Sequence, residues 1–324
     1  MFRIGVLGCG SIASTLSGTF KAMEGVECFA VASRDETRAK AFAAEHGYTK
    51  YYGSYEALVA DSDVDLVYVA TPHSRHYEDM RLCIEAGRPV ICEKSFTVNA
   101  AEAKEIARLS GEKKVYTAEA IWPRYMPSRK MIEDVLDSGI IGDIDILTAN
   151  LSYPISSVKR LIDPEQAGGA LLDVGVYGVS FALTYFGNEV EKVESSVQML
   201  DTGVDGKESI TIYFKDGRMA VLTHGILSRS DRKGIFYGSK GYIVVENINN
   251  PQCIRVYDGE DRLLDEQFVP KQISGYEYEF IEARDRIAAG ETESLSMPLQ
   301  DTIKVMEVMD TVRKGWGLVY PKER

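Results

Sequence analysis

The sequence has few cysteines, and their spacing matches no known pairing motif. There are five, and no two form a Cys-x-x-Cys pair. They are Cys9, Cys28, Cys83, Cys92 and Cys253. An odd number at scattered positions argues against a disulfide framework and against a structural zinc site.

The sequence also lacks an uninterrupted apolar run of the roughly 20 residues that a membrane span requires. Residues 1–7 begin like a secretion signal. Their apolar stretch is short, however, and runs directly into a glycine-rich turn, which is typical of a strand. We therefore expect no membrane partner and a cytoplasmic location.

Positive charge is in deficit. Lysine and arginine number 37 against 49 aspartate and glutamate, which gives a formal net charge of −12. An acidic surface repels phosphate backbones, so we expect no nucleic-acid partner. A local basic patch can still hold one small phosphorylated ligand.

What is present is a chain of 324 residues, a length that favours about two domains. The first 120 residues alternate short apolar runs with amphipathic stretches, a pattern that predicts a doubly wound parallel sheet covered on both faces. The expected strands are 4–7, 28–32, 66–70, 90–92 and 115–117, and the expected helices are 12–23, 36–46, 76–86 and 100–110.

After Trp122 the pattern changes to an α/β domain with a large, mostly antiparallel open sheet. A hairpin turn is expected at 215–218, and Gly139 is expected to end the helix 128–138. We place a Rossmann domain at 1–121 and a substrate-binding and oligomerisation domain at 122–324, whose C-terminal helix can pack back on the first. The expected strands here are 144–153, 190–199, 209–214, 219–225, 234–237, 242–246 and 254–257, and the remaining helices are 170–186, 276–289 and 299–314.

The segment Gly8-Cys9-Gly10-Ser11-Ile12-Ala13 fits the pattern G-x-G-x-x-G/A. It follows a strand and opens a helix, which is the context that makes this pattern specific for a dinucleotide. Gly8 permits the tight turn, Gly10 lets a pyrophosphate approach the backbone, and Ala13 allows close helix–strand packing. The helix N-terminus offers free N–H groups to the phosphates. The alternative is a plain glycine turn.

The end of the second strand indicates which cofactor is preferred. An NAD enzyme places an acidic residue there to bind the ribose 2′-hydroxyl. Here Ser33 and Arg34 stand in that place, Arg38 follows one turn later, and Asp35 is expected to cap the next helix. A serine and an arginine suit a 2′-phosphate, so we predict NADP. If Arg34 is merely solvated or stacks on adenine, NAD is possible as well.

Several stretches together resemble the Gfo/Idh/MocA family of oxidoreductases. Besides the glycine turn they are Ala70-Thr71-Pro72 with His76, Cys92-Glu93-Lys94, Trp122-Pro123-Arg124-Tyr125-Met126-Pro127 and Gly168-Gly169-Ala170-Leu171-Leu172-Asp173-Val174-Gly175-Val176-Tyr177. The last two are especially similar to the branch of dimeric dihydrodiol dehydrogenases and NADP-dependent xylose dehydrogenases. The resemblance covers nearly the whole chain.

This resemblance implies a Rossmann domain joined to an open-sheet domain, and a homodimer or homotetramer formed through that sheet. It implies a small-molecule substrate, a sugar or cyclic diol. With the glycine turn and the second strand included, the predicted cofactor-binding residues are Gly8, Gly10, Ser11, Ile12, Ala13, Ser33, Arg34, Arg38, Thr71, Pro72, His73, His76, Glu93, Lys94, Trp122 and Arg124. The predicted substrate pocket holds Lys94, Tyr125, Tyr153, Asp173 and Tyr177.

The family resemblance assigns the proton chemistry to a lysine with a histidine or a tyrosine, here Lys94 and Tyr177. Lys94 follows a strand at the edge of the sheet where ligands bind, and its ammonium can stabilise a developing alkoxide. Asp173 and Tyr177 stand four positions apart on one face of an expected, otherwise apolar helix. A buried aspartate needs a partner or a substrate. The alternatives are a solvated lysine, a structural aspartate and a core tyrosine.

The resulting hypothesis makes Tyr177 the acid/base, Lys94 its activator and Asp173 the holder of the substrate hydroxyl. A free tyrosine has a pKa near 10, and lowering it by two units takes roughly 2.7 kcal/mol. A neighbouring ammonium can supply that amount in a partly dry cleft.

Further residues are placed by the resemblance. Arg124 is expected near a cofactor phosphate and Trp122 near the nicotinamide, although the same stretch also suits a rigid domain linker. His73 and His76 form His-x-x-His, but no third ligand is evident, so we predict no metal site. Apart from the resemblance, Lys159 and Arg160 are expected in the loop after Tyr153, where they can touch the substrate.

One position departs from the family. The family motif is usually Glu-Lys-Pro, and this chain has Ser95 after Lys94. In many members the Lys-Pro bond is cis and turns the lysine toward the cofactor. Either the bond before Ser95 is also cis, or it is trans and Lys94 is aimed elsewhere.

Three functions fit these observations. The first is an NADP-dependent dehydrogenase or reductase acting on CH–OH groups. The second is a redox-neutral sugar-processing enzyme with a tightly bound cofactor, although relatives that cleave glycosides typically have a histidine in place of Tyr177. The third is a dinucleotide-binding sensor without turnover. The intact set of Lys94, Asp173 and Tyr177 favours the first.

Overall fold

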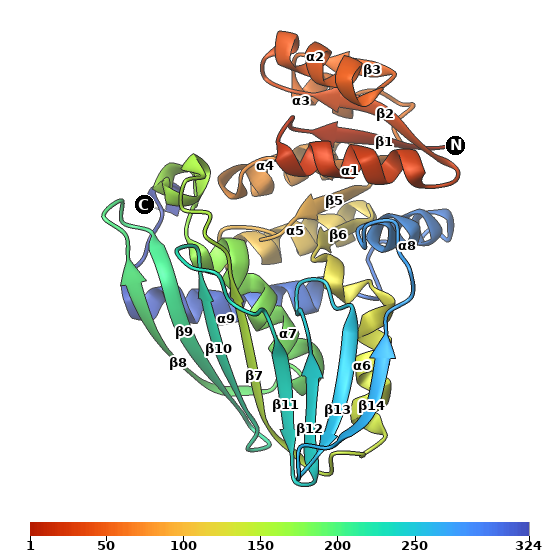
Figure 1. Cartoon of the computed structure of the whole chain (residues 1–324). Coiled ribbons are helices and arrows are strands. Elements are labelled where there is room, and N and C mark those ends of the chain that lie inside the picture. The colour runs from red at the N-terminus through yellow and green to blue at the C-terminus, as the bar shows by residue number, and fades with distance from the viewer. Residues whose placement is uncertain (324) are drawn as a thin grey trace. The chain divides into compact units, whose positions relative to one another are not determined.

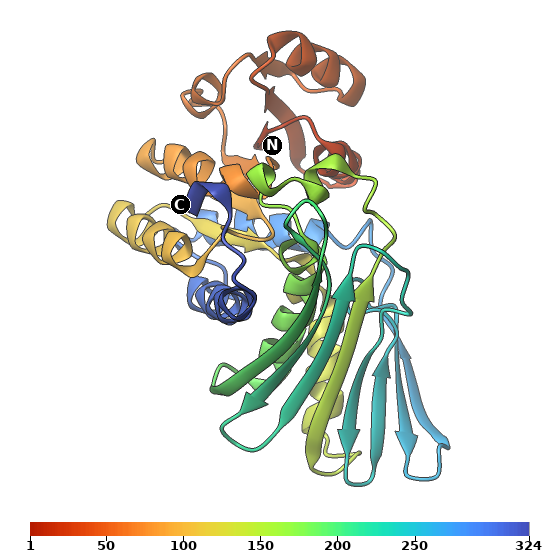
Figure 2. The same ribbon diagram turned by 90° about the vertical axis from the view of Figure 1, so that its left-hand side faces the viewer.

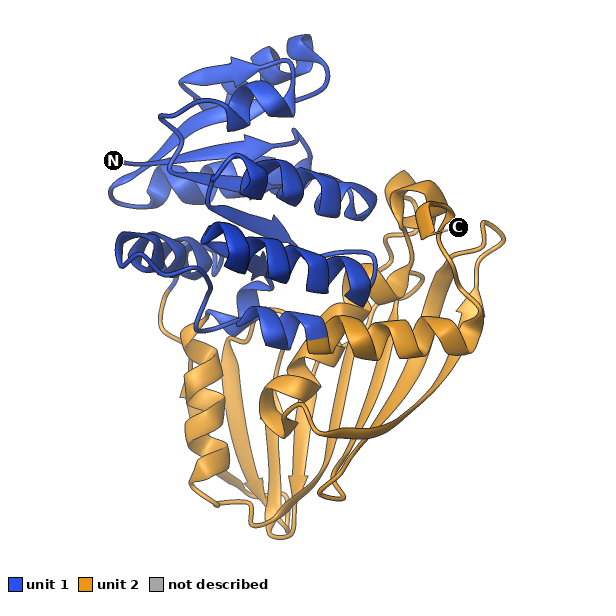
Figure 3. Ribbon diagram, turned by 180° about the vertical axis from the view of Figure 1, so that it is seen from behind, with its two compact units in different colours: residues 1–125, 272–303 blue, residues 126–271, 304–324 orange. Residues whose placement is uncertain are grey.

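The computed structural model describes residues 1–323, and the chain divides into two compact units (Figure 3). Unit 1 consists of Met1–Tyr125 and Gln272–Ile303, and unit 2 of Met126–Lys271 and the chain from Lys304 onward. The chain therefore returns to the first unit over 272–303, a stretch that the predicted boundaries of 1–121 and 122–324 assign to the second.

Unit 1 is built on a six-stranded parallel sheet in the order β3-β2-β1-β4-β5-β6, which confirms the predicted doubly wound fold. Strand β3 was not predicted because three residues are too few to show a period. The strands are β1 (Phe2–Leu7), β2 (Val26–Ala32), β3 (Lys50–Tyr52), β4 (Leu66–Val69), β5 (Val90–Glu93) and β6 (Thr117–Ala120).

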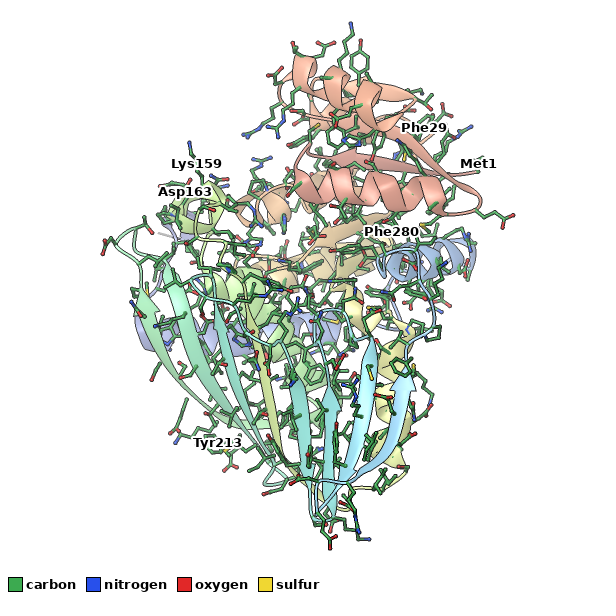
Figure 4. The ribbon with its side chains drawn as sticks, viewed as in Figure 1. Met1, Phe29, Lys159, Asp163, Tyr213 and Phe280 are labelled. Carbon is green, nitrogen blue, oxygen red and sulfur yellow. The ribbon has the colours of Figure 1, made fainter. Side chains whose placement is uncertain are left out.

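Helices cover both faces of this sheet (Figure 1). The late helix α8 belongs to the face of α1, because Phe280 meets Phe20 at 4.7 Å and Tyr68 at 5.5 Å between ring centroids (Phe280 is labelled in Figure 4). The helices are α1 (Ser11–Ala22), α2 (Glu36–His46), α3 (Tyr55–Val59), α4 (His73–Glu85), α5 (Ala100–Lys113) and α8 (Glu277–Ala288), with the 3₁₀ turn η1 (Trp122–Arg124).

Unit 2 is built on an eight-stranded sheet in the order β14-β13-β12-β11-β7-β10-β9-β8. Only the β7–β10 pair is parallel, so the predicted mostly antiparallel sheet is confirmed, as is the hairpin turn at 215–218. The strands are β7 (Ile144–Ser152), β8 (Val190–Met199), β9 (Asp205–Phe214), β10 (Met219–Gly225), β11 (Gly234–Gly238), β12 (Gly241–Val245), β13 (Cys253–Asp258) and β14 (Leu263–Phe268).

The helices of unit 2 gather on one face of the sheet (Figure 2). Residues along β9 and β10 accordingly alternate between buried positions and partly or fully exposed ones. These helices are α6 (Pro127–Asp137), α7 (Val176–Phe186) and the part of α9 (Leu299–Trp316) that follows Ile303, with the short segments η2 (Lys159–Ile162), η3 (Pro164–Gln166), η4 (Leu171–Gly175) and η5 (Pro321–Glu323).

The helix predicted over 170–186 is present, but its first turn, η4, is a π-helical segment in which the Val176 N–H donates to the Leu171 carbonyl. Apolar periodicity does not distinguish the two helix types over a single turn.

The segment Pro164–Phe186 is long and apolar enough to cross a membrane, but 83% of its most apolar window is buried, as in a core helix.

Candidate active site

The glycine turn joins β1 to α1 in the geometry that a dinucleotide needs. Gly8 has a φ of +109°, and a Cβ there would lie 2.8 Å from the Ala70 carbonyl oxygen, so only glycine fits. Gly10 is the N-cap of α1, no side chain caps the helix, and its first turn has no acidic residue. Ala13 is fully buried. The helix N-terminus is thus left to an anion, which fits a pyrophosphate.

The segment that runs from the end of β2 into α2 carries Ser33, which is buried, and the arginines Arg34 and Arg38, which are exposed. Asp35 caps α2 as predicted, accepting hydrogen bonds from the backbone of Thr37 and Arg38 at 2.9 and 3.2 Å. Arg38 also donates from Nη2 to the Cys9 carbonyl at 2.8 Å, so its guanidinium lies beside the glycine turn. Arg34 is exposed and forms no hydrogen bond or ion pair with the described residues. Asp35, the acidic residue that directly follows Arg34, is therefore committed to the helix cap.

The turn after β4 is fixed by a buried aspartate. Asp79 accepts from the Thr71 hydroxyl and from the Arg75 guanidinium, both at 2.7 Å. Pro72 is the N-cap of α4, and His73 is the first residue of that helix. The Thr71-to-His73 segment thus starts α4 in a defined conformation, with the hydroxyl of Thr71 donating a hydrogen bond to Asp79 on that helix.

His76 is fully buried, with its two ring nitrogens facing two carbonyl oxygens. Nδ1 lies 2.8 Å from the Ser95 carbonyl, and Nε2 lies 2.8 Å from the Thr71 carbonyl. Burial lowers the pKa of His76, and a neutral ring can donate to only one of the two carbonyls. The side chain ties the turn after β4 to the turn after β5, and no metal-binding group of three or more residues occurs in the described chain.

The Glu93-Lys94-Ser95 segment begins at the last residue of β5. Of the two geometries expected for the Lys94–Ser95 peptide bond, the structure has cis. Glu93 is buried, and its carboxylate accepts from the Tyr68 hydroxyl and from the backbone of Lys94. Glu93 is thereby anchored in the core of unit 1, while Lys94 is half-buried at the carboxyl end of the strand.

Glu119 and Glu279 are further buried acids of unit 1 that sequence reasoning missed. Glu119 on β6 accepts from the Phe96 N–H at 3.2 Å, and burial raises its pKa to about 7. Glu279 on α8 is fully buried, and burial with the nearby Glu93 raises its pKa as well. A glutamate between two alanines in an apolar strand is the signal that could have identified Glu119.

The segment after β6 is held by the returning chain of unit 1. Trp122 stacks on Tyr276, with ring centroids 4.2 Å apart and planes at 20°. Arg124 donates from Nε to the Ser296 carbonyl at 2.9 Å and from Nη2 to Asp301 at 2.6 Å. The Tyr125 hydroxyl donates to the Glu119 carbonyl at 2.8 Å. These contacts hold the segment rigidly, as the alternative of a rigid domain linker requires.

Asp173 and Tyr177 lie in unit 2, on the helix that begins with η4. Both are buried, with 5% and 9% of their surfaces exposed. Asp173 has the partner that its burial requires, because Arg160 donates from Nη2 to its Oδ1 at 3.0 Å. Arg160 comes from η2, and its neighbour Lys159 is labelled in Figure 4. Tyr153, at the end of β7, is half-buried, and its hydroxyl accepts from Asn249 Nδ2 at 3.4 Å.

The predicted site residues therefore fall into two groups. The predicted cofactor-binding residues all belong to unit 1, together with Lys94 and Tyr125. Tyr153, Asp173 and Tyr177 belong to unit 2.

Known proteins resemble this chain over almost its full length. Residues 2–120 match the oxidoreductase family with an NAD-binding Rossmann fold, and residues 130–244 match the GFO/IDH/MocA C-terminal domain. The chain is 32% identical to the trans-1,2-dihydrobenzene-1,2-diol dehydrogenase of Mus musculus over 335 residues, 99% of each chain. The Homo sapiens enzyme of that name is also 32% identical, again over 99% of each chain.

Solved structures give the same picture. A 3-ketoreductase from Actinomadura kijaniata, KijD10, in complex with NADP and TDP-benzene, has a TM-score of 0.89 at 26% identity over 97% of each chain. Levoglucosan dehydrogenase in complex with NADH and levoglucosan shares the fold, with a TM-score of 0.86 at 18% identity over 98% of this chain and 97% of that one. The full-length identity to the dihydrodiol dehydrogenases and the matches to both domains show that the chain belongs to the Gfo/Idh/MocA family of oxidoreductases.

Proposed function

We propose that this oxidoreductase transfers a hydride between NADP and a secondary alcohol or hemiacetal carbon of a sugar or cyclic diol. The observation that carries the proposal is that Asp173 and Tyr177 are both buried on one helix. The chain that contains them is 32% identical to a dihydrodiol dehydrogenase over 99% of its length. The bound nicotinamide supplies the hydride acceptor in the oxidation direction and the hydride donor in the reduction direction.

The preference for NADP is supported by the end of β2. Asp35 is committed to the cap of α2, which leaves the side chains of Ser33 and Arg34 to meet the ribose, with Arg38 beside the glycine turn. Guanidinium groups pair well with a phosphate, whereas a carboxylate would repel it. The ketoreductase resembling this chain was crystallised with NADP and the levoglucosan dehydrogenase with NADH, so resemblance alone does not choose between the two cofactors.

In the proposed mechanism Tyr177 takes the hydroxyl proton of the substrate as the alcohol is oxidised, and returns it in reduction. Asp173 holds a substrate hydroxyl, and the hydrogen bond from Arg160 keeps that carboxylate in place. Lys94 stabilises the developing alkoxide and favours the phenolate form of Tyr177. Trp122, held by Tyr276, forms an apolar wall beside the nicotinamide.

We also propose that the chain forms a homodimer or homotetramer through the open face of the unit 2 sheet. On that face a row of apolar and aromatic side chains runs in register across seven strands. Two members of this row, Tyr237 and Leu263, are 39% and 52% exposed. A contiguous exposed apolar patch is typical of a protein–protein interface. The row consists of Tyr213 (labelled in Figure 4), Met219, Ile146, Tyr237, Tyr242, Tyr257 and Leu263.

A screen with both NADP and NAD tests the function. The panel contains aldoses, inositols and cyclic diols, and the readout is the absorbance of the reduced cofactor. We expect turnover with a member of the panel and a higher kcat/KM with NADP. Cofactor that co-purifies with the protein, with no net reduced cofactor formed, would favour the redox-neutral alternative. Cofactor binding without any turnover would favour the sensor.

A further inference from the structure

A buried polar cluster of Asp205, Glu208 and His224 lies beneath the helix that carries Asp173 and Tyr177. Glu208 on β9 and His224 on β10 are directly opposite each other in the register of the sheet. Their side chains are fully buried, with His224 Nδ1 3.3 Å from Glu208 Oε1. Asp205, where β9 begins, is also fully buried. Burying polar groups costs free energy unless they are hydrogen-bonded or paired, so polar side chains at these positions point to a role that apolar ones cannot fill.

The helix above this cluster approaches it with glycines. A Cβ at Gly178 would overlap His224 Nε2, and a Cβ at Gly175 would lie 2.8 Å from Glu208 Oε1. A Cβ at Gly169, just before the helix, would overlap Asp205 Oδ1. Each of the three polar side chains thus occupies the space that a helix side chain would otherwise fill. The distance between the helix backbone and the sheet is set by these pairs.

The cluster also fixes where the π-helical segment begins. Asp205 Oδ2 accepts the backbone N–H of Leu171 at 2.6 Å, at the first residue of η4. The same loop is held from the C-terminal end of the chain, because the Tyr320 hydroxyl donates to the Gly168 carbonyl at 2.7 Å. Isolated π-helical turns occur frequently at functional sites. Here the turn contains Asp173, and Tyr177 lies between two of the glycines.

We propose that Asp205, Glu208 and His224 are positioning residues, which hold the π-helical turn and the start of α7 so that Asp173 and Tyr177 are aimed at the substrate. This inference rests on the proposed function for what those two side chains do. None of the three touches the substrate in this account. They act through the backbone of residues 169–178, where a shift of about 1 Å is enough to lower turnover roughly 100-fold.

The charge state of the cluster adds a second expectation. Burial raises the pKa of Glu208 to about 8, and burial with the neighbouring Glu208 raises that of Asp205 to about 7. Burial lowers the pKa of His224 to about 3. The groups facing Glu208 are His224 from β10, Asp205 from β9 and Tyr320 near η5, while the helix presents glycine. Near pH 7 the carboxyl of Glu208 is thus protonated, and ionisation above pH 8 places a charge against the helix.

The first test is Gly178→Ala, with Gly315→Ala as the matched control. Gly315 lies in α9, where a Cβ would meet nothing within 4 Å. We expect Gly178→Ala to lower kcat at least tenfold while the Kd for NADP, measured by fluorescence titration, stays within twofold. The control should change neither value. Adding His224→Ala to Gly178→Ala removes the overlapping ring and should restore part of the lost kcat. A kcat unchanged by Gly178→Ala, or a double variant no better than the single one, would overturn the proposal.

A second variant, Glu208→Gln, keeps the test decisive if Gly178→Ala does not fold. Glutamine reproduces the neutral carboxyl at every pH. We expect it to keep kcat near the wild-type value at pH 7 and to move the alkaline decline of kcat to higher pH. Superimposable pH profiles would contradict the positioning role.

Amide hydrogen exchange of residues 170–178 separates this inference from the proposed function, since it needs no substrate. We expect exchange there to be at least tenfold faster in Gly178→Ala than in the wild type, and partly restored in the double variant. If the wild type turns over no substrate of the panel, the proposed function fails while this measurement still decides the positioning. Unchanged exchange in Gly178→Ala would overturn the positioning whatever the activity.

Discussion

The two sheets of this molecule are used in different ways. The parallel sheet of unit 1 is covered on both faces, and the residues proposed to act there, Gly8, Arg34 and Lys94, lie at its strand ends. The sheet of unit 2 carries its helices on one face (Figure 2), and the proposed acid/base lies on one of those helices. A covered parallel sheet presents backbone and loops to a ligand. A half-open sheet leaves one face for helices and the other for the interface proposed above.

The buried acids of the two units also differ in how they hold the neighbouring backbone. In unit 1 Glu93 and Glu119 accept hydrogen bonds from backbone N–H groups next to the strand ends, and so hold the loop that carries Lys94. In unit 2 Glu208 faces a glycine of a helix and finds no hydrogen-bond donor at hydrogen-bonding geometry among the described residues. The acids of unit 1 thus hold a loop through hydrogen bonds, whereas Glu208 in unit 2 holds a helix through close packing against its glycine.

The largest expected effect separates the proton chemistry of unit 2 from the cofactor site of unit 1. Tyr177→Phe removes the hydroxyl proposed as acid/base, and we expect kcat to fall roughly 100- to 10,000-fold at every pH. The Kd for NADP should stay within twofold, because all the residues proposed to hold the cofactor belong to unit 1. Steady-state kinetics and fluorescence titration measure the two values. Unimpaired turnover would remove Tyr177 from the mechanism.

The open face of unit 2 is tested by placing a charge in its apolar row. Tyr242 stacks on Tyr257, with ring centroids 4.9 Å apart. Tyr242→Asp would bury an unpaired carboxylate in the proposed interface, and we expect dimer dissociation to be favoured by about 2–5 kcal/mol. Light scattering across a concentration series gives the oligomeric state, and Leu82→Asp on α4 of unit 1 serves as the comparison. An unchanged mass for Tyr242→Asp would place the interface elsewhere.

The strand end of unit 1 is tested through Arg34. Arg34→Ala removes a guanidinium proposed to meet the 2′-phosphate, an interaction worth about 1.5–3 kcal/mol. We expect kcat/KM with NADP to fall roughly 10- to 100-fold while kcat/KM with NAD changes little. Asp35 is left untouched as the cap of α2. Equal losses with both cofactors would mean that Arg34 contacts a part of the cofactor common to both.

The smallest expected effect concerns stability. Burial raises the pKa of Glu119 to about 7 in the folded chain, from 4.5. The folded state therefore keeps a proton that the unfolded state releases, and the stability present below pH 4.5 is lost as pH rises through 7. We expect the wild type to lose on the order of 1–3 kcal/mol over this interval relative to Glu119→Gln. Urea unfolding at several pH values measures the difference, and parallel curves would contradict it.

Much of this architecture can be predicted from the sequence, because it follows from local patterns. The glycine turn, the cap at Asp35 and the hairpin at 215–218 each depend on a few adjacent residues, and all are present as predicted. The doubly wound sheet follows from alternating periods and the handedness of crossovers.

The rest depends on contacts distant in sequence. The return of 272–303 to unit 1 rests on Phe280 meeting Tyr68, more than 200 positions away, and no local pattern encodes such a pairing. The π-helical turn at Asp173 depends on Asp205, which accepts a backbone N–H from another element. The polar cluster beneath α7 was missed for the same reason: an alternating strand shows which residues point inward, but not that His224 and Glu208 meet there.

The most direct test of the whole account is the rate of NADPH formation by the purified wild-type chain with a panel of cyclic trans-diols and aldoses. The account predicts saturable formation of NADPH with at least one of these substrates, a lower kcat/KM with NAD, and a rate lowered at least 100-fold by Tyr177→Phe, in the range that general acid–base catalysis contributes. Formation of reduced cofactor at the same rate in wild type and Tyr177→Phe, or none in the wild type, would contradict it.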